Sequence, residues 1–158
     1  MQKREQLMKE FSELIQFVES LRELDQLTWI TPLAEGKWTL RDVVAHIMLW
    51  DKYFLEEGIQ KITNNQPVTV QHLNFDQFNQ KAVDYAKRTS RQEIIDRTIQ
   101  YRSELINQIQ SLSEEAFIEE RVDGDGNKFS AYQYLLDFIW HDHHHINQLK
   151  TFLSKREA

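Results

Sequence analysis

The segment that decides the fold runs from residue 39 to residue 54 and reads TLRDVVAHIMLWDKYF. Thr39 has the character of a helix N-cap, and Asp42 falls in the first turn that follows. The apolar side chains recur at three- and four-residue spacing, the period of an amphipathic α-helix; they are Leu40, Val43, Ile47, Trp50 and Phe54. The sequence therefore predicts a helix with one buried face, which fades between residues 58 and 65.

Three other long segments show the same helical period. One covers roughly residues 4–24, another begins at Ser90 and runs to about residue 112, and the last begins at Ser130 and runs to about residue 153. Glu93 follows Ser90 by three residues, and Gln133 follows Ser130 in the same way, so both helices begin with a capping-box pattern. Four long amphipathic helices in one small chain predict an all-α fold, a four-helix bundle.

The segments between these helices are shorter and more polar. Pro32 and Gly36 mark an irregular stretch after the first helix, and residues 64–73 are predicted as a loop. An extra short helix is expected over Phe75–Lys87. The turn residues Asp123–Asn127 indicate a short hairpin or a simple loop.

The composition limits the classes of function. The 158 residues fit a single domain over 1–158, and the absence of cysteine excludes disulfides, thiolate metal sites and a cysteine nucleophile. A formal charge of −6, with lysines and arginines scattered, argues against a nucleic-acid partner. No apolar run approaches the roughly 20 residues of a membrane span, and the N-terminus lacks a signal-peptide pattern. We therefore expect a protein of the cytoplasm.

Four of the six histidines lie in the run His141-Asp142-His143-His144-His145. Successive residues of a helix are turned by about 100°, so His141 and His145 share a face, roughly 40° apart. Apolar residues of the same helix lie close to that face. An i, i+4 pair of imidazoles can bind one metal ion, as in H-E-x-x-H sites.

The third ligand must then come from another helix, and His46 is the candidate. Val43, Ile47 and Trp50 are its neighbours on one side of the predicted helix, so its ring lies at the edge of an apolar stripe. A buried polar ring without a partner costs a few kcal/mol, and a shared metal would satisfy all three rings. Two simpler interpretations stay open, in which His46 is a hydrogen-bonded core residue and the His-rich run is a solvated tract.

The remaining polar and aromatic residues carry weaker expectations. His72 falls in the predicted loop, and His143 and His144 are expected to face solvent or a neighbouring subunit. Asp142 lies near the middle of the apolar face, where it can accept a hydrogen bond from a liganding imidazole or bind a buried arginine. Five aromatic residues are expected in the core or in a pocket wall: Trp38, Trp50, Phe54, Tyr134 and Trp140.

Two motifs resemble those of the DinB/YfiT-like superfamily of metal-dependent bundle proteins. The segment Gly36–His46 resembles the pattern G-x-W-[ST]-x-x-x-[IV]-x-x-H at the start of the family's second helix. The segment His141–Leu149 resembles the pattern H-[ED]-x-x-H-x-x-Q-[IL] in its last helix. Both occur in register, and the order of the helices fits nearly the whole chain.

The resemblance implies a site, a topology and an assembly. His46, His141 and His145 would be the metal ligands, with zinc or nickel as the metal in many members. The helices would run up-down-down-up, and homodimers would be frequent. Asp142 stands where many members have Glu, which can alter the surroundings of the ligands but leaves the ligand set unchanged.

The expected function follows from an open metal site. Three neutral nitrogen ligands leave at least one free coordination position, as in catalytic rather than structural centres. The leading hypothesis is a metal-dependent enzyme that transfers a low-molecular-weight thiol onto an electrophile or hydrolyses a small substrate, with thiol transfer slightly favoured by the family resemblance. Because the chain has no cysteine, the thiol would be a cosubstrate. The alternative is a non-catalytic bundle that binds a small molecule or a protein, with a structural or vestigial metal.

Overall fold

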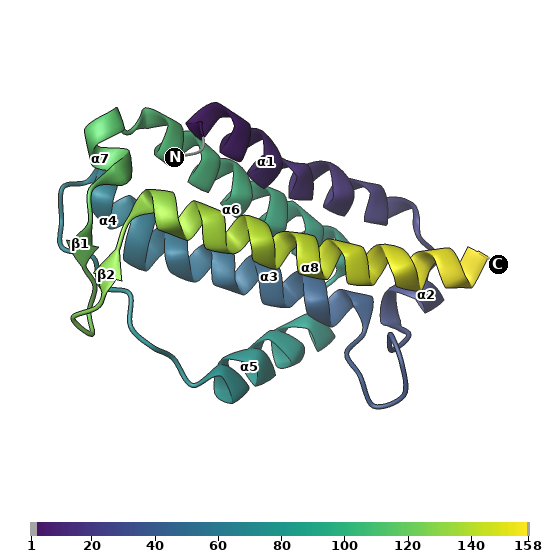
Figure 1. Ribbon diagram of the computed structural model, residues 1–158. Helices are drawn as coiled ribbons and strands as arrows, with labels where there is room; N and C mark the ends of the chain where they lie inside the picture. Colours follow the sequence, from purple (N-terminus) through teal and green to yellow (C-terminus); the bar gives the residue numbers. More distant parts are fainter. Residues whose placement is uncertain (1–2, 158) are drawn as a thin grey trace.

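The four long helices of the computed structural model, which describes residues 3–157, form an all-α bundle (Figure 1). They are α1 (Arg4–Ser20), α3 (Leu40–Phe54), α6 (Arg91–Ser111) and α8 (Ala131–Glu157). Helices α1 and α8 run in one direction and α3 and α6 in the other, which is the expected up-down-down-up arrangement. Helix α6 packs against both α1 and α3, and α1 packs against α8.

Because α3 and α6 are parallel, the chain must return along the bundle between them. It does so through residues 64–74 and helix α5 (Phe75–Lys87), which packs on α3. The bounds of α5 are those that the sequence predicts, and the Asn74 side chain caps its first turn by accepting from the amide of Gln77. This crossing helix lies outside the four-helix core, beside the middle of α3 (Figure 1).

The helix that contains His46 continues past Phe54. A π-helical turn, η2 (Leu55–Ile59), joins it to α4 (Gln60–Thr63), so the helical path ends inside the predicted range of 58–65. Gly58 lies in this turn, where a Cβ atom would come within 3.0 Å of the Phe129 ring and 3.3 Å of Val70. The glycine therefore lets the hairpin and the extended segment pack closely on the turn.

The N-caps predicted at Thr39, Ser90 and Ser130 are present. The boxes predicted at Ser90 and Ser130 are incomplete, because the Glu93 side chain pairs with Arg97 and that of Gln133 donates to Asp137. Thr39 and Asp42 form a full capping box, since the Asp42 amide donates to Thr39 Oγ1 at 3.0 Å and the Thr39 amide to Asp42 Oδ2 at 3.1 Å. Ser90 and Ser130 accept from the amides three residues further on. These bonds fix where α3, α6 and α8 begin.

Several short elements were not predicted from the sequence. Two five-residue helices, α2 (Gln26–Ile30) and α7 (Glu114–Ile118), lie in segments that were predicted to be irregular. They were missed because one helical turn is too short to show an apolar period. The first helix also ends as an α-helix at Ser20 and tightens into a 3₁₀ turn, η1 (Leu21–Glu23). Residues 121–129, by contrast, form the short hairpin that was one of the two predictions for this segment, with β1 (Arg121–Val122) antiparallel to β2 (Lys128–Phe129).

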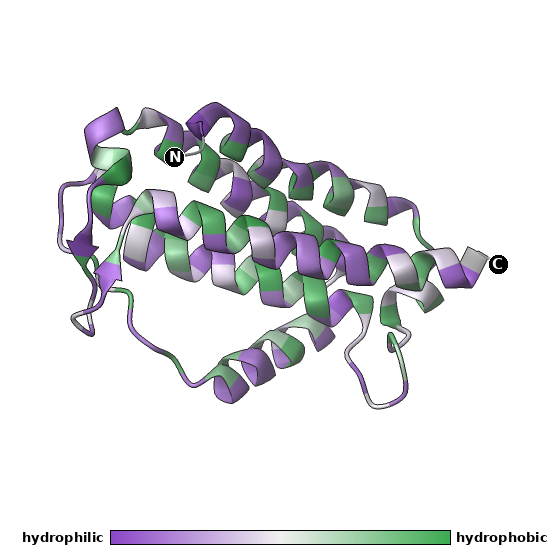
Figure 2. Cartoon of the chain, viewed as in Figure 1, coloured by the Kyte–Doolittle hydropathy of each residue, from purple (hydrophilic) through white to green (hydrophobic). Residues whose placement is uncertain are grey.

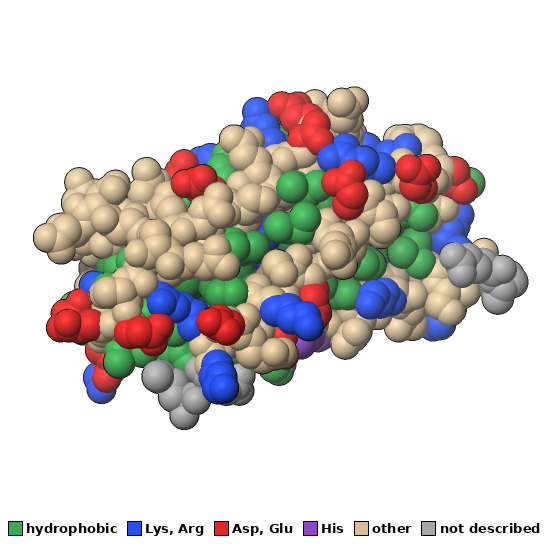
Figure 3. Space-filling view, turned by 90° about the horizontal axis from the view of Figure 1, so that it is seen from above, with side chains coloured by type: hydrophobic (Ala, Val, Ile, Leu, Met, Phe, Trp, Pro, Cys, Tyr) green, Lys and Arg blue, Asp and Glu red, His purple; other side chains and the backbone are tan. Residues whose placement is uncertain are grey.

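The surface is mixed in character. Hydrophobic and hydrophilic residues alternate along each helix (Figure 2), and acidic and basic side chains are interspersed on the face seen in Figure 3.

The prediction that Trp140 lies in the core or in a pocket wall is wrong, because this side chain is 71% exposed. It points away from the core and stacks on His144, one turn further along the outer face of α8. None of the described helices is long and apolar enough to cross a membrane.

Candidate metal centre

The three predicted histidines come together between α3 and α8. His46 lies in the middle of α3, and His141 and His145 lie one turn apart on α8. One ring nitrogen from each histidine can be chosen so that all three lie within 4.8 Å of one another. Nε2 of His141 and Nε2 of His145 are 3.3 Å apart. The helical spacing that suggested the site therefore does place the three rings in one cluster.

The distance between His141 and His145 fits two ligands of a tetrahedral metal ion. Two imidazole nitrogens bound at about 2.0–2.1 Å with a tetrahedral angle lie about 3.3–3.4 Å apart. The separation between His141 and His145 has this value. Nδ1 of His145 is buried without a hydrogen-bond partner among the described residues, and His46 is 7% exposed. One buried and two partly buried imidazoles that lie close together are a donor set that suits a divalent ion.

Asn79 is a member of the site that was not predicted from the sequence. Its Oδ1 atom lies 3.0 Å from Nδ1 of His46, so the crossing helix α5 contacts a candidate ligand directly. An amide oxygen only accepts, so Nδ1 of His46 donates and its Nε2 keeps the free lone pair. This is the arrangement in which a neighbouring group fixes the tautomer of a ligating histidine.

The protein environment keeps the three rings neutral. Burial, followed by the neighbouring His145 and His141, lowers the pKa of His46 from 6.5 to about 3. Burial and the nearby His141 lower the pKa of His145 to about 4. Burial likewise lowers the pKa of His141. Neutral imidazole is the form that binds metal, so the cluster is prepared for an ion at neutral pH.

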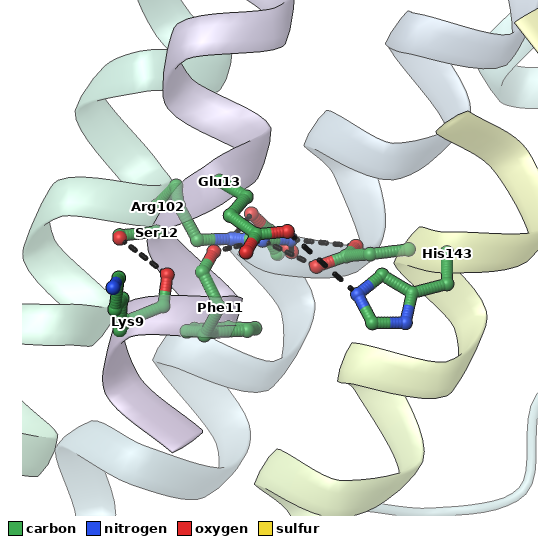
Figure 4. Close-up of polar contacts among 8 residues, drawn as sticks. Lys9, Phe11, Ser12, Glu13, Arg102 and His143 are labelled. Atoms are coloured by element: carbon green, nitrogen blue, oxygen red, sulfur yellow. Dashed lines mark hydrogen bonds and ion pairs between the residues drawn. The ribbon is translucent and has the colours of Figure 1, made fainter. Parts of the chain in front are cut away.

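A buried ionic cluster lies directly behind the histidines, and Figure 4 shows its centre. The guanidinium of Arg102 on α6 donates to Asp51 on α3 through Nε at 2.8 Å and Nη2 at 3.0 Å. It also donates to Asp142 on α8 at 2.6 and 3.1 Å, and to the carbonyl of Phe11 on α1 at 2.9 Å. All five N–H groups of one arginine are thus used, and they join the four long helices.

This cluster decides between the two roles expected for Asp142. The carboxylate binds a buried arginine, and the structure shows no hydrogen bond from it to an imidazole. Asp51 was not predicted to take part. Burial raises the pKa of Asp51 to about 6, against the opposing effect of Arg102. Asp51 and Asp142 lie on the helices that carry the histidines, so the cluster fixes the relative positions of α3 and α8.

Two pockets open onto the three histidines, and they are lined by different residues. The first, of about 410 Å³, is lined by apolar rings together with His46, His141 and Asn79. The second, of about 310 Å³, reaches His145, and its mixed lining includes the polar side chains of Lys37 and Gln148 as well as apolar ones. The lining of the first pocket includes Trp50 and Phe54, as expected, and that of the second includes Trp38.

The other predicted residues lie outside the cluster. Tyr134 is buried behind the first pocket, where its ring packs on Phe54 and Phe138, and it is absent from the pocket lining. His72 and His144 are exposed, as predicted. His143 is partly exposed, and its Nε2 atom lies 3.8 Å from a carboxylate oxygen of Glu13 of α1. A dashed line joins these two side chains in Figure 4.

The fold and the site together define a class of protein: an up-down-down-up four-helix bundle with three converging imidazoles between two of its helices. The DinB superfamily matches residues 6–149, and the chain therefore belongs to that superfamily.

The solved structure of YfiT from Bacillus subtilis has a similar fold. It is described as a probable metal-dependent hydrolase with an unusual four-helix bundle topology. The likeness has a TM-score of 0.81 and covers 99% of this chain and 91% of that one, at 14% sequence identity. At this identity the comparison shows the shared fold. No curated protein matches the sequence.

Proposed function

We propose that this chain is a metal-dependent enzyme in which His46, His141 and His145 hold a divalent ion, either zinc or nickel. The observation that carries this proposal is the convergence of three imidazoles, two of which, His46 and His141, line a pocket of about 410 Å³. Three nitrogen ligands leave a coordination position free, and the pocket gives a small molecule a route to it.

The ionic cluster supports an open site rather than a closed structural one. A fourth protein ligand would favour a purely structural metal. Asp142, which follows His141 in the sequence, is the acidic residue considered for that position. Both of its oxygens accept hydrogen bonds from Arg102, and Asp142 does not belong to the group of converging ligand atoms among the described residues. This supports the enzyme over the alternative of a non-catalytic binding bundle.

The protein groups around the site have separate tasks. When bound, a divalent ion supplies Lewis-acid chemistry, which polarises a carbonyl and lowers the pKa of water or of a thiol. Asn79 orients the ring of His46, and the aromatic residues of the pocket wall give the site an apolar side. The carboxylates of Asp51 and Asp142 hold the supporting helices in register through Arg102.

Hydrolysis of a small substrate is the reaction we favour, and the description of YfiT as a probable metal-dependent hydrolase supports it. Transfer of a low-molecular-weight thiol is the second candidate. The pocket that reaches His145 favours it, because Lys37 and Gln148 can bind a polar, anionic cosubstrate apart from an apolar acceptor. Rates measured with aryl esters, with and without added thiol, distinguish the two reactions.

The first experiment is elemental analysis of protein purified without a histidine tag or chelator. We expect near-stoichiometric metal in the wild type and its loss in His46→Ala, since this residue lies outside the His-rich run. His72→Ala is the matched control, because it removes an exposed histidine and should keep the metal. Metal absent from the wild type after incubation with zinc and nickel would overturn the proposal.

A further inference from the structure

The pocket beside His46 and His141 has a lining that selects among substrates. We propose that it binds the uncharged aryl part of the substrate, so that the enzyme acts on neutral aryl compounds carrying a carbonyl-type acceptor next to the ring. This inference rests on the proposed function, since it assigns a substrate class to the same site.

Four aromatic rings make up most of the pocket wall: Trp50, Phe54, Phe75 and Phe138. Trp50 stacks on Phe54 with centroids 5.7 Å apart, and its other contacts extend to α5, where Phe78 stacks on it at 4.0 Å. Phe138 continues the wall to His141, with ring centroids 5.5 Å apart. Flat rings pack well against such a surface through offset and edge contacts.

The charges around the pocket disfavour ions. The described residues of its lining include no carboxylate, ammonium or guanidinium group. A charged ring substituent would lose its hydration without gaining a partner there. A cation would also be repelled by the divalent ion held on the histidines, in spite of the aromatic faces.

The exposed side chain of Phe75 would cover part of a ligand ring in this pocket. Its side chain is 54% exposed although it lies at the edge of an aromatic cluster, with its ring 5.9 Å from that of Trp50. As the first residue of α5, it stands at the mouth of the pocket. A ligand ring that entered beside it would bury apolar surface that is now in water, which is a favourable contribution to binding.

Asn79 supplies the polar contact of this pocket besides the imidazoles. Its Oδ1 atom is engaged by His46, so the group that it can still offer a ligand is its amide N–H. A donor next to the metal position suits a carbonyl oxygen better than a hydroxyl or ammonium proton. This is the reason for assigning an acceptor to the substrate.

The test uses calorimetric titration with 2-naphthamide, a neutral aryl amide, and with the isosteric cation naphthalene-2-carboxamidine. Both ligands are titrated into zinc-loaded protein and into protein dialysed against a chelator. We expect the amide to bind at least about tenfold more tightly than the amidine to the zinc-loaded protein. Acetamide, which lacks the ring, should show no measurable binding.

The matched variants are Phe75→Ala and Trp140→Ala, each of which removes an exposed aromatic side chain. Only Phe75 lies in the pocket, so its loss should weaken amide binding about three- to tenfold, whereas Trp140→Ala should leave binding unchanged. Equal affinity in wild type and Phe75→Ala, or equal affinity for amide and amidine, would overturn the inference.

Failure of this inference can be separated from failure of the proposed function. Stoichiometric metal that depends on His46, together with amide binding that ignores Phe75, would refute the substrate class and leave the metal enzyme intact. Amide binding that depends on Phe75 in a protein that takes up no metal would support the pocket and refute the metal centre.

Discussion

Replacing Arg102 with methionine would remove the side chain that joins the four long helices. Methionine has a similar length but no hydrogen-bond donor, so the carboxylates of Asp51 and Asp142 would stay buried without a partner. Their side chains are only 1% and 2% exposed. The variant would also lose the guanidinium that packs over the Phe11 ring, 3.9 Å from its centroid.

The expected cost follows from this geometry. Breaking a buried ion pair by removing one partner destabilises a protein by about 3–5 kcal/mol. That is a large share of the roughly 5–15 kcal/mol by which folded domains are stable. In a chain of this size it corresponds to a fall in melting temperature of roughly 6–20 °C.

Urea and thermal denaturation followed by circular dichroism measure this cost. Arg22→Met is the matched control, because Arg22 also binds two carboxylates, Glu19 and Asp96, but does so at the surface. Such pairs contribute about 0–1 kcal/mol each, so the control should be much closer to wild type.

The orphaned carboxylates of Asp51 and Asp142 would have two further effects on stability. If the cost comes from orphaned carboxylates, changing Asp51 and Asp142 to asparagine in the Arg102→Met background should restore part of the lost stability. The cost should also be smaller at pH 5 than at pH 7, since a buried carboxyl without its arginine takes up a proton more easily in acid. An Arg102→Met protein as stable as Arg22→Met, or a triple variant less stable than Arg102→Met, would refute the account.

Three further predictions concern single features of the structure. Because the pKa values of His46 and His145 are lowered from 6.5 to about 3 and about 4, their contribution to stability is complete above pH 6.5 and falls as the pH drops towards 4. The pKa of Asp51 is raised to about 6, so this carboxyl adds stability as the pH falls from 6 to 3.8 and opposes the loss from the histidines. One group is outweighed by two. In urea titrations from pH 7.5 to pH 5, the metal-free wild type should therefore lose more stability than His46→Gln. Asn79→Ala should weaken metal affinity about 10- to 100-fold in chelator competition, whereas Asn79→Asp, which keeps an acceptor, should stay close to wild type; equal affinities would contradict the role of this contact. Thr39→Ala should cost about 1 kcal/mol in urea denaturation through the lost cap, and Thr39→Ser should restore most of it.

The long helices could be predicted because each carries its own signals. The apolar stripe and capping box around Thr39, the caps at Ser90 and Ser130, and the bounds of α5 all depend on residues within a few positions of one another. The pairing of His141 with His145 could be predicted for the same reason, since one helical turn separates them. His46 could be assigned to the same site from its position beside an apolar stripe and from the family resemblance.

The contacts between helices could not be predicted in this way. Arg102 falls on the apolar stripe of α6, four residues after Thr98 and three before Leu105, and this is a signal that it is buried. Nothing in the local pattern says that Asp51 and Asp142 are its partners, because each lies on a different helix. The bond from Asn79 to His46 likewise depends on how the crossing helix docks.

The order of the helices also determines when the site can form during folding. His46 and His141 are about 95 residues apart in the chain, so bringing them together closes a long loop. The entropic cost of closing this loop is larger than that of a contact between residues close in sequence. Contacts of such sequence separation slow the folding of a domain. His46 lies on α3 and the other two histidines lie on α8, so the three imidazoles meet only when α8 packs beside α3. A metal ion bound there would stabilise the docked state of α8, because it binds the folded arrangement and not the separated helices. Metal release would accordingly report the undocking of α8.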